Sequence, residues 1–377
     1  MRNVWNRLPQ SIAVSVYCNR LHIKLIHRSF WVHIVQTAAA MKASESDGRT
    51  TPQTATLRDV ARASGVSTAS ASRALAGEGA VTTELRSRIL AAAARLGYVT
   101  NMAARTLATG QSGLVGIVVQ TLADPLVANI LTACERRLAE SACGVMLTTT
   151  GGSAEENLRA THALLGRGAE ALVLAEVGAS AELARTIAAR RVPWVSLAER
   201  ASAAGVPSFS VGRRQGAALA ALYLQSLGHR RFAVIAQPDG DAADAVRQVL
   251  AAASLPVEVL AAGHDLDAAR TAIGGLLEQD EPPTAVICAS DVQALAVLRE
   301  CAIRHVAVPQ RLSVIGFGDA ELTRRSYPAL STVRVAATEV GVRVAQAVLA
   351  SLKRDASPVS NVPVKLIARE STGPALA

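Results

Sequence analysis

The chain has 377 residues, 50% of them hydrophobic, and a formal net charge of +9. This length allows two or three domains with sizeable cores, and no stretch approaches the roughly 18 apolar residues of a membrane span. Five scattered cysteines without a C-x-x-C pair argue against a zinc site or a disulfide framework, and they fit a reducing cytoplasm.

The positive charge lies entirely ahead of the large C-terminal region. Residues 1–50 carry seven Lys and Arg against two acids, and residues 51–112 carry seven Arg against three acids. Residues 113–377 are therefore neutral overall. A basic N-terminal part is what a polyanion such as DNA attracts. For residues 1–50, a basic tail without a partner remains an alternative.

The first 50 residues match no domain pattern. The segment 11–18 is apolar but short, and Arg20 and Lys24 follow it closely, so a signal peptide is not expected. Met41 opens a polar run that is typical of a disordered start. We expect residues 1–50 to be a basic, disordered extension or a misassigned start, with translation beginning near Met41.

Residues 51–100 are predicted to form three short helices. The first follows Thr56, a candidate N-cap, with Asp59 in the capping-box position. Its apolar stripe consists of Leu57, Val60 and Ala61. The segment 64–66 is predicted to be a tight turn, and Ser67 the cap of the second helix.

The second helix is expected to turn one small apolar face inward, made of Ala71, Ala74 and Leu75. Its outer face carries Thr68, Ala69, Ser72 and Arg73. A third helix is expected at about 84–96, with Gly97 as its stop. The core face of this helix consists of Leu85, Ile89, Leu90, Ala93 and Leu96. This is the helix-turn-helix arrangement, whose second helix enters the major groove; a three-helix bundle without a ligand is the alternative.

From Leu114 onward, apolar strand segments alternate with helical patterns. The predicted strands are 114–119, 144–149, 171–174, 194–197, 232–236, 257–261, 285–288 and 312–317. The helices between them lie at around 126–140, 154–166, 180–190, 213–227, 241–253, 266–279 and 291–304. The apolar character of the predicted strands suits parallel strands that are buried on both faces, and the alternation with helices suits βαβ units. About eight to ten strands indicate two doubly wound subdomains, with a ligand cleft beyond the carboxyl ends of the strands.

Several motifs occur in an order that resembles the lactose/galactose repressor family, in its gluconate-repressor-like branch. They lie at 56–110, 112–119, 227–233, 290–296, 308–319 and 328–333. The resemblance implies an N-terminal all-α helix-turn-helix headpiece at 51–100 and a hinge helix and linker at 101–112. It implies for residues 113–377 an α/β two-subdomain, periplasmic-binding-protein-like effector domain with parallel sheets, joined by three crossovers.

The exposed residues of the headpiece are candidate DNA contacts. Thr68 and Ala69 are placed to meet base edges, and Arg73 to reach a guanine or a phosphate. Short hydroxyls suited to phosphate oxygens belong to Thr56, Ser67 and Ser72. For the last three, capping a helix or facing solvent is the structural alternative. Tyr98 is expected to pack against the headpiece while its hydroxyl reaches the DNA backbone.

The resemblance adds three DNA contacts in the hinge: Asn101, Ala104 and Leu107. In the family, the leucine matched by Leu107 enters the minor groove, where an apolar wedge kinks the duplex. The alternative is an ordinary apolar linker residue. Thr100 stands where the family usually has proline, so the entry to the hinge is expected to be less rigid. Two headpieces that read a pseudo-palindromic operator imply a homodimer, and the absence of a leucine heptad after Gly373 favours a dimer over a tetramer.

The resemblance implies a small effector in the cleft. Its candidate contacts are Leu126, Val127, Glu176, Ser196, Arg247, Ser290, Asp291, Gly318 and Asp319. The loop at 124–127 lacks the aromatic pair of many relatives, and Gly318 replaces a common aspartate, departures that resemble the gluconate branch. Arg247 falls where relatives place an arginine that holds hydroxyls or carboxylates, which suggests a sugar acid such as gluconate. For Asp291, capping the following helix is an equal alternative.

Enzymatic motifs are missing from the sequence. The segment 316–318 lacks the third glycine of a dinucleotide fingerprint, and Walker A, H-E-x-x-H and G-x-S-x-G motifs do not occur. His229 is expected to be a turn or capping residue. We therefore expect a cytoplasmic repressor without catalytic residues, cofactor, metal or membrane partner. A sugar-binding transport component would need a secretion signal and would leave 56–107 unexplained, and a sugar-modifying enzyme would need a nucleophile or an acid/base pair.

Overall fold

The computed structural model describes residues 55–77, 81–100, 106, 110–199, 205–237, 240–263, 266–353, 355 and 362–375. The extension at 1–50 and the predicted hinge contacts Asn101, Ala104 and Leu107 lie outside these residues. Two compact units divide after Thr100. No helix in the described part of the chain is both long and apolar enough to cross a membrane.

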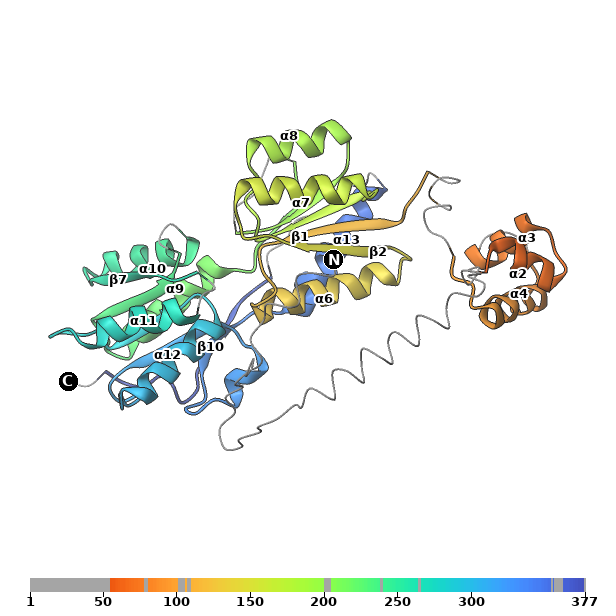
Figure 1. The fold of residues 1–377 in the computed structure, drawn as a ribbon. Coiled ribbons are helices and arrows are strands. Elements are labelled where there is room, and N and C mark those ends of the chain that lie inside the picture. Colours follow the sequence, from red (N-terminus) through yellow and green to blue (C-terminus); the bar gives the residue numbers. More distant parts are fainter. Residues whose placement is uncertain are drawn as a thin grey trace, which may run out of the picture. The chain divides into compact units, whose positions relative to one another are not determined.

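The headpiece consists of three helices, α2 (Leu57–Ser64), α3 (Thr68–Ala76) and α4 (Thr83–Leu96) (Figure 1). Each begins at a hydroxyl cap and ends at a glycine with positive φ. The caps Thr56 and Ser67 and the stop Gly97 are as predicted, whereas the cap Thr82 and the stop Gly77 were not identified from the sequence. Small side chains allow the helices to approach closely, and the core consists of Val60, Ala61, Ala71, Ala74, Ile89, Ala92 and Ala93.

Two core residues predicted for α4 are instead exposed. Leu90 is 47% and Leu96 37% accessible, whereas Ala92 is buried. Successive residues of a helix are rotated by about 100°, so the face centred on Ile89 includes Ala92 and Ala93 and turns Leu90 outward. The predicted stripe on α4 was therefore too wide on the Leu90 side. Leu96 shares the face of Ile89 but is the last residue of α4.

The N-terminal lobe contains one parallel sheet of order β2-β1-β3-β4-β5. Its strands are β1 (Leu114–Val119), β2 (Gly144–Thr149), β3 (Ala171–Ala175), β4 (Trp194–Leu197) and β5 (Ser208–Phe209). One face packs against α7 (Ala154–Gly166) and α8 (Ala181–Arg190). The other packs against α6 (Pro125–Ala139) and α13 (Ala337–Leu352), and both layers are visible in Figure 1.

The C-terminal lobe contains a sheet of order β11-β10-β9-β8-β6-β7, in which only β11 runs antiparallel to its neighbour. Its strands are β6 (Phe232–Ala236), β7 (Val257–Ala261), β8 (Ala285–Cys288), β9 (Ser313–Gly318), β10 (Ser331–Arg334) and β11 (Lys365–Ile367). Helices α9 (Arg213–Ser226) and α10 (Asp241–Ala252) cover one face, and α11 (Leu266–Leu277) and α12 (Asp291–Ile303) cover the other. A 3-10 turn, η2 (Glu321–Arg324), precedes β10.

The chain crosses between the lobes three times: at 210–212 between β5 and α9, at 335–336 between β10 and α13, and between α13 and β11. The predicted fold class is confirmed, and all eight predicted strands are present, six with the predicted bounds. The sequence reasoning did not identify β5, β10, β11 or α13. The last three matter most, because they carry two of the crossovers.

Candidate DNA-binding helix and interlobe site

Helix α3 presents Thr68, Ala69, Ser72 and Arg73 to solvent, as predicted. The Arg73 Nε donates to the Ala69 carbonyl at 3.3 Å, so the Arg73 side chain lies along the helix up to Nε. The outer face thus offers two hydroxyls, a methyl group and a guanidinium. These groups can read base edges and hold phosphates.

Two of the predicted phosphate contacts act as helix caps. The Thr56 hydroxyl donates to Asp59 Oδ2 at 2.6 Å, and the Asp59 amide donates to Thr56 Oγ1 at 3.4 Å. Hydrogen bonds from Thr56 lower the pKa of Asp59. The Ser67 Oγ accepts from the Ser70 amide at 3.1 Å. Tyr98 is half-buried against the headpiece core, as predicted. The side chains of Thr56 and Ser67 therefore serve as helix caps, which is the structural alternative to a phosphate contact.

In the other unit, the Arg213 guanidinium joins the two lobes. Its Nη2 lies 3.1 Å from both oxygens of Glu176 and 3.3 Å from Asp124 Oδ2, in the N-terminal lobe. Its Nη1 donates to the Ala289 carbonyl at 2.9 Å, and its Cζ lies 5.3 Å from the centre of the Phe317 ring, in the C-terminal lobe. Burial acts to lower the pKa of Arg213, but the charges of Glu176 and Asp124 outweigh it and raise the pKa. Arg213 therefore stays protonated.

Helix α9 begins at this junction without a side-chain cap of its own, because its N-cap is Gly212. Glu199, which follows β4, takes that role: its Oε1 accepts from the Arg213 amide at 2.7 Å. A carboxylate at a helix N-terminus is favoured by the helix dipole. The backbone on which Arg213 stands is thus held by the opposite lobe.

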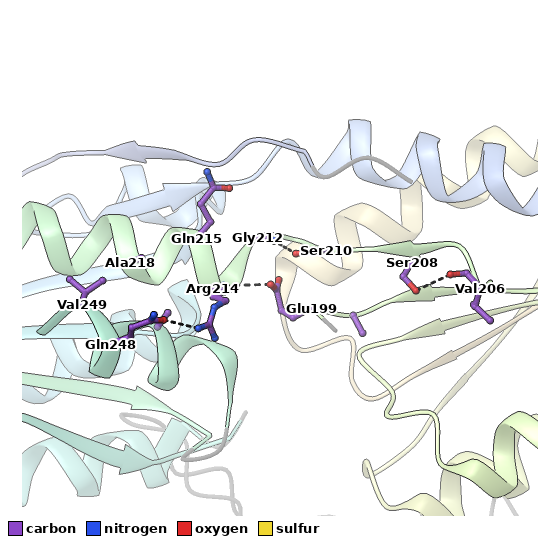
Figure 2. Close-up of a pocket in the computed structure, with 12 residues that line it drawn as sticks. Glu199, Val206, Ser208, Ser210, Gly212, Arg214, Gln215, Ala218, Gln248 and Val249 are labelled. Carbon is purple, nitrogen blue, oxygen red and sulfur yellow. Dashed lines mark hydrogen bonds between the residues drawn. The ribbon is translucent and has the colours of Figure 1, made fainter. Parts of the chain in front are cut away.

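A groove of about 740 Å³ opens beside Arg213 and takes residues from both lobes. Figure 2 shows Glu199, Ser208 and Ser210 on the N-terminal side and Arg214 and Gln248 on the C-terminal side. Arg214 Nη2 donates to Gln248 Oε1 at 2.8 Å across its floor. The volume suits a small organic molecule, and none of the nine predicted effector contacts lines this groove.

Two predicted effector contacts, Ser290 and Asp291, lie at the start of α12. Ser290 caps the helix by accepting from the Gln293 amide, whereas Asp291 is buried and accepts from Thr332 Oγ1 at 2.5 Å and from the Ala320 amide at 2.7 Å. Burial raises the pKa of Asp291 to about 6, although both hydrogen bonds act to lower it. Asp291 thus joins α12 to β10 rather than capping α12.

Asp319 is the centre of an arginine cluster. Its carboxylate pairs with Arg334 at 2.5 Å, with Arg324 at 3.3 Å and with Arg369. Burial acts to raise its pKa, but the hydrogen bonds from Arg369 and Arg334 outweigh this effect and lower it. Gly318, with φ +131°, would bring a Cβ to 3.2 Å from Asp291 Oδ2. The Asp319 carboxylate is thus engaged within the C-terminal lobe, whereas Gly318 also faces the N-terminal lobe, where a Cβ would lie 3.5 Å from Leu126 Cβ.

The remaining predicted effector contacts are spread over several elements. Leu126 and Val127 are buried in the first turn of α6, and Ser196 is buried in β4. Arg247 lies on the exposed face of α10, where it pairs with Asp244 at 3.1 Å. Of the nine candidates, Glu176 is the residue that contacts the interlobe arginine.

Sequence reasoning missed Arg213, Asp124 and Phe317. Asp124 was noted only as part of a loop, and Arg213 only as the start of a helix. The available signal was the position of each residue near the carboxyl end of a strand or after a crossover, where open α/β folds bind ligands: Asp124 in the loop after β1, Phe317 near the end of β9 and Arg213 after the crossover at 210–212. In the described ranges, no three His, Cys, Asp or Glu side chains gather closely enough to hold a metal ion.

Two family models match the chain. The description "Bacterial regulatory proteins, lacI family" covers residues 56–101, and "Periplasmic binding protein-like domain" covers residues 221–372. The HTH-type transcriptional regulator GntR of Pseudomonas aeruginosa is 30% identical over 331 residues, which span 84% of this chain and 95% of that protein.

Solved structures show the same architecture. The lac repressor dimer bound to operator and an anti-inducer aligns with a TM-score of 0.74, at 24% identity, over 85% of this chain and all of that one. The transcriptional regulator CelR in complex with cellobiose aligns with a TM-score of 0.61, at 25% identity, over 84% of this chain and 99% of that one. These relatives are transcription regulators and not enzymes, in agreement with the family model over residues 56–101 and with the prediction from the sequence. The chain belongs to the LacI family of bacterial DNA-binding transcription regulators.

Proposed function

We propose that this regulator is a sequence-specific repressor whose helix α3 enters the major groove of a pseudo-palindromic operator. The observation that carries this proposal is the capped α3 with Thr68, Ala69, Ser72 and Arg73 all directed to solvent. Further exposed arginines on the same headpiece, Arg58, Arg62, Arg86, Arg88 and Arg95, supply the charge that phosphates require. The protein acts in the cytoplasm, where bacterial DNA lies.

The proposal extends to the hinge at 101–112. There Asn101 and Ala104 contact the DNA and Leu107 enters the minor groove, as the family resemblance implies. An inserted leucine unstacks a base step and bends the duplex, which increases the surface that the protein contacts. Residues 51–100 then form the headpiece and residues 113–377 the effector-binding and dimerisation domain.

A homodimer completes the proposal. The segment before β10 exposes two large apolar side chains, Tyr327 at 96% and Leu322 at 63%. Such a pair on one short segment is suited to contact with a second copy, and two-fold symmetry matches the symmetry of a pseudo-palindrome.

The effector in this proposal is a small sugar, or a sugar acid such as gluconate, bound between the lobes. The convergence of Asp124, Glu176 and Arg213 at the interlobe junction supports a polar ligand, as does the likeness to CelR, a protein solved with cellobiose. The sugar-acid alternative depends on Arg247, which pairs with Asp244 on the exposed face of α10. If gluconate is the effector, Arg247→Ala loses the response to gluconate while operator binding persists; an unchanged response removes this alternative.

Operator binding tests the function directly. The full chain and a chain beginning at Met41 are titrated against DNA flanking their own gene and against an unrelated duplex of equal length, across a salt series. We expect far tighter binding to the flanking DNA, its loss in Leu107→Ala, and its retention in Leu222→Ala, a control with an exposed leucine on α9. Weak binding that is equal on both duplexes and collapses with salt would mean that only the basic charge is at work.

A further inference from the structure

We propose that Asp124 and Glu176 anchor the effector, and that Arg213 is a built-in occupant of that anchor which the effector displaces. The ligand class follows: a molecule with hydroxyl or ammonium donors and no negative charge, which means a neutral sugar or an amino sugar. This inference rests on the proposed function, because it concerns the effector that the interlobe cleft binds.

The surroundings of the Arg213 guanidinium form a receptor for hydrogen-bond donors. They consist of two carboxylates from the N-terminal lobe, with a carbonyl and an aromatic face from the C-terminal lobe. Carboxylates, a carbonyl and a ring face are the groups that hold cations and hydroxyls. The Arg213 guanidinium therefore occupies the positions that we assign to the donor groups of the ligand, and it contacts both lobes from there.

The position of Arg213 in the chain allows this exchange. It is the first residue of α9 and directly follows the crossover at 210–212. The groove is lined by Gly212 and Arg214, the residues on either side of Arg213. Arg213 itself does not line the groove, because Arg214, Gln215 and Ala218 of α9 face it whereas the Arg213 guanidinium lies over Phe317. A ligand reaches the anchor at Glu176, whose side chain is 19% exposed. Glu199 keeps the start of α9 in place by accepting from the Arg213 amide.

The charges at the junction disfavour an anion. Asp124 and Glu176 contribute two negative charges against the single positive charge of Arg213, and Asp291 adds a further buried carboxyl nearby whose ionisation is opposed by Asp124. An acid that captured Arg213 would leave Asp124, which is 3% exposed, without its cation. Burying an unpaired carboxylate is costly. A donor-rich ligand instead replaces the contacts that Arg213 gives up.

Chemical rescue tests the anchor. Arg213→Ala removes the occupant, and its melting temperature is measured with propylguanidinium or with butyrate at millimolar concentration. We expect a lower melting temperature than that of the wild type, recovery of most of the loss with propylguanidinium, and none with butyrate. Rescue should disappear in Arg213→Ala/Glu176→Gln. Arg214→Ala, whose guanidinium binds Gln248 in the neighbouring groove, is the matched control and should show no rescue. If Arg213→Ala does not fold, Arg213→Met keeps the aliphatic stem and takes its place.

Rescue by butyrate, or by neither compound, would overturn the inference. Glucose, glucosamine and gluconate then distinguish a ligand without negative charge from an acid, because the three share a carbon skeleton and differ in charge. We expect glucose or glucosamine to bind Arg213→Ala more tightly than wild type; a gain for gluconate alone contradicts the inference. Operator binding of the wild type, measured separately, tests the proposed function itself and does not depend on these results.

Discussion

The surroundings of individual side chains decide between the readings that the sequence left open. Thr56 and Ser67 are occupied as caps, so any phosphate contact by them is secondary to holding α2 and α3. Arg73 has no comparable anchor beyond a bond to its own helix. It is therefore the α3 residue whose loss should affect DNA most and folding least.

We predict that Arg73→Ala weakens operator binding by about 1–3 kcal/mol, roughly 5- to 150-fold, with little change in the melting temperature. Arg190→Ala, an exposed arginine in the last turn of α8 and outside the headpiece, is the control. Titrations against the operator and against single-base variants separate two roles: relaxed specificity at one position indicates a guanine contact, and uniform weakening with a shallower salt dependence indicates a phosphate contact. Equal losses in both variants would contradict the assignment.

His229 is a structural histidine rather than a catalyst. It is buried between Thr284, Ser313 and the Gly373 carbonyl, at 3.0–3.1 Å from each. Burial lowers its pKa, although the bond to Gly373 opposes this effect.

In the unfolded chain the His229 imidazole takes up a proton near the ordinary histidine pKa of 6.5, whereas in the folded chain its pKa is lower. His229 should therefore reduce stability as the pH falls below about 6.5. We predict that the difference in melting temperature between wild type and His229→Gln narrows as the pH is lowered from 7.5 to about 5. His162→Gln, on the exposed face of α7, is the matched control. A difference that is independent of pH would show that His229 is equally protonated in both states.

At the scale of elements, local patterns identified eight strands and most helices, but not β5, β10, β11 or α13. The apolar stripe of α13, Val340, Val344 and Val348, is rich in β-branched residues, which weakens a helical signal. The helix packs on α6 within the N-terminal lobe, although α6 lies about 200 residues earlier in the chain. Gly341 permits this contact, since a Cβ there would lie 2.2 Å from the Ile130 carbonyl oxygen.

We predict that Gly341→Ala destabilises the large unit by about 1–3 kcal/mol, because α13 must move away from α6. Gly275→Ala in α11 is the matched control: nothing lies within 4 Å of its Cβ position, so alanine should stabilise by roughly 0.5–1 kcal/mol. Urea denaturation measures both changes. Stabilisation by both substitutions would refute the close approach of α6 and α13.

At the scale of the whole molecule, the proposed function depends on pairing two headpieces. Neither the operator-facing helix nor the interlobe junction requires a second copy, but a pseudo-palindrome does. The apolar pair Leu322 and Tyr327 is the candidate contact, since both side chains extend from one short segment of the C-terminal lobe.

We predict that Leu322→Ser/Tyr327→Ser shifts the protein from dimer to monomer in sedimentation velocity. Operator affinity should fall about 100-fold or more, as the second headpiece loses its tether. Leu222→Ser, an exposed leucine on α9, should remain dimeric and bind normally. A double variant that stays dimeric would place the interface elsewhere.

The sequence by itself determined the fold class and most of the elements. Caps, glycine stops and apolar periodicity act within a few residues, so Thr56, Ser67 and Gly97 could be assigned without coordinates. Only the tertiary structure decided which residues meet between the lobes. Arg213 joins Glu176, Asp124 and Ala289, which are 37, 89 and 76 residues away in the chain. Such contacts arise from the order of strands in two sheets and from three crossovers, and no local pattern encodes which strand ends will face one another.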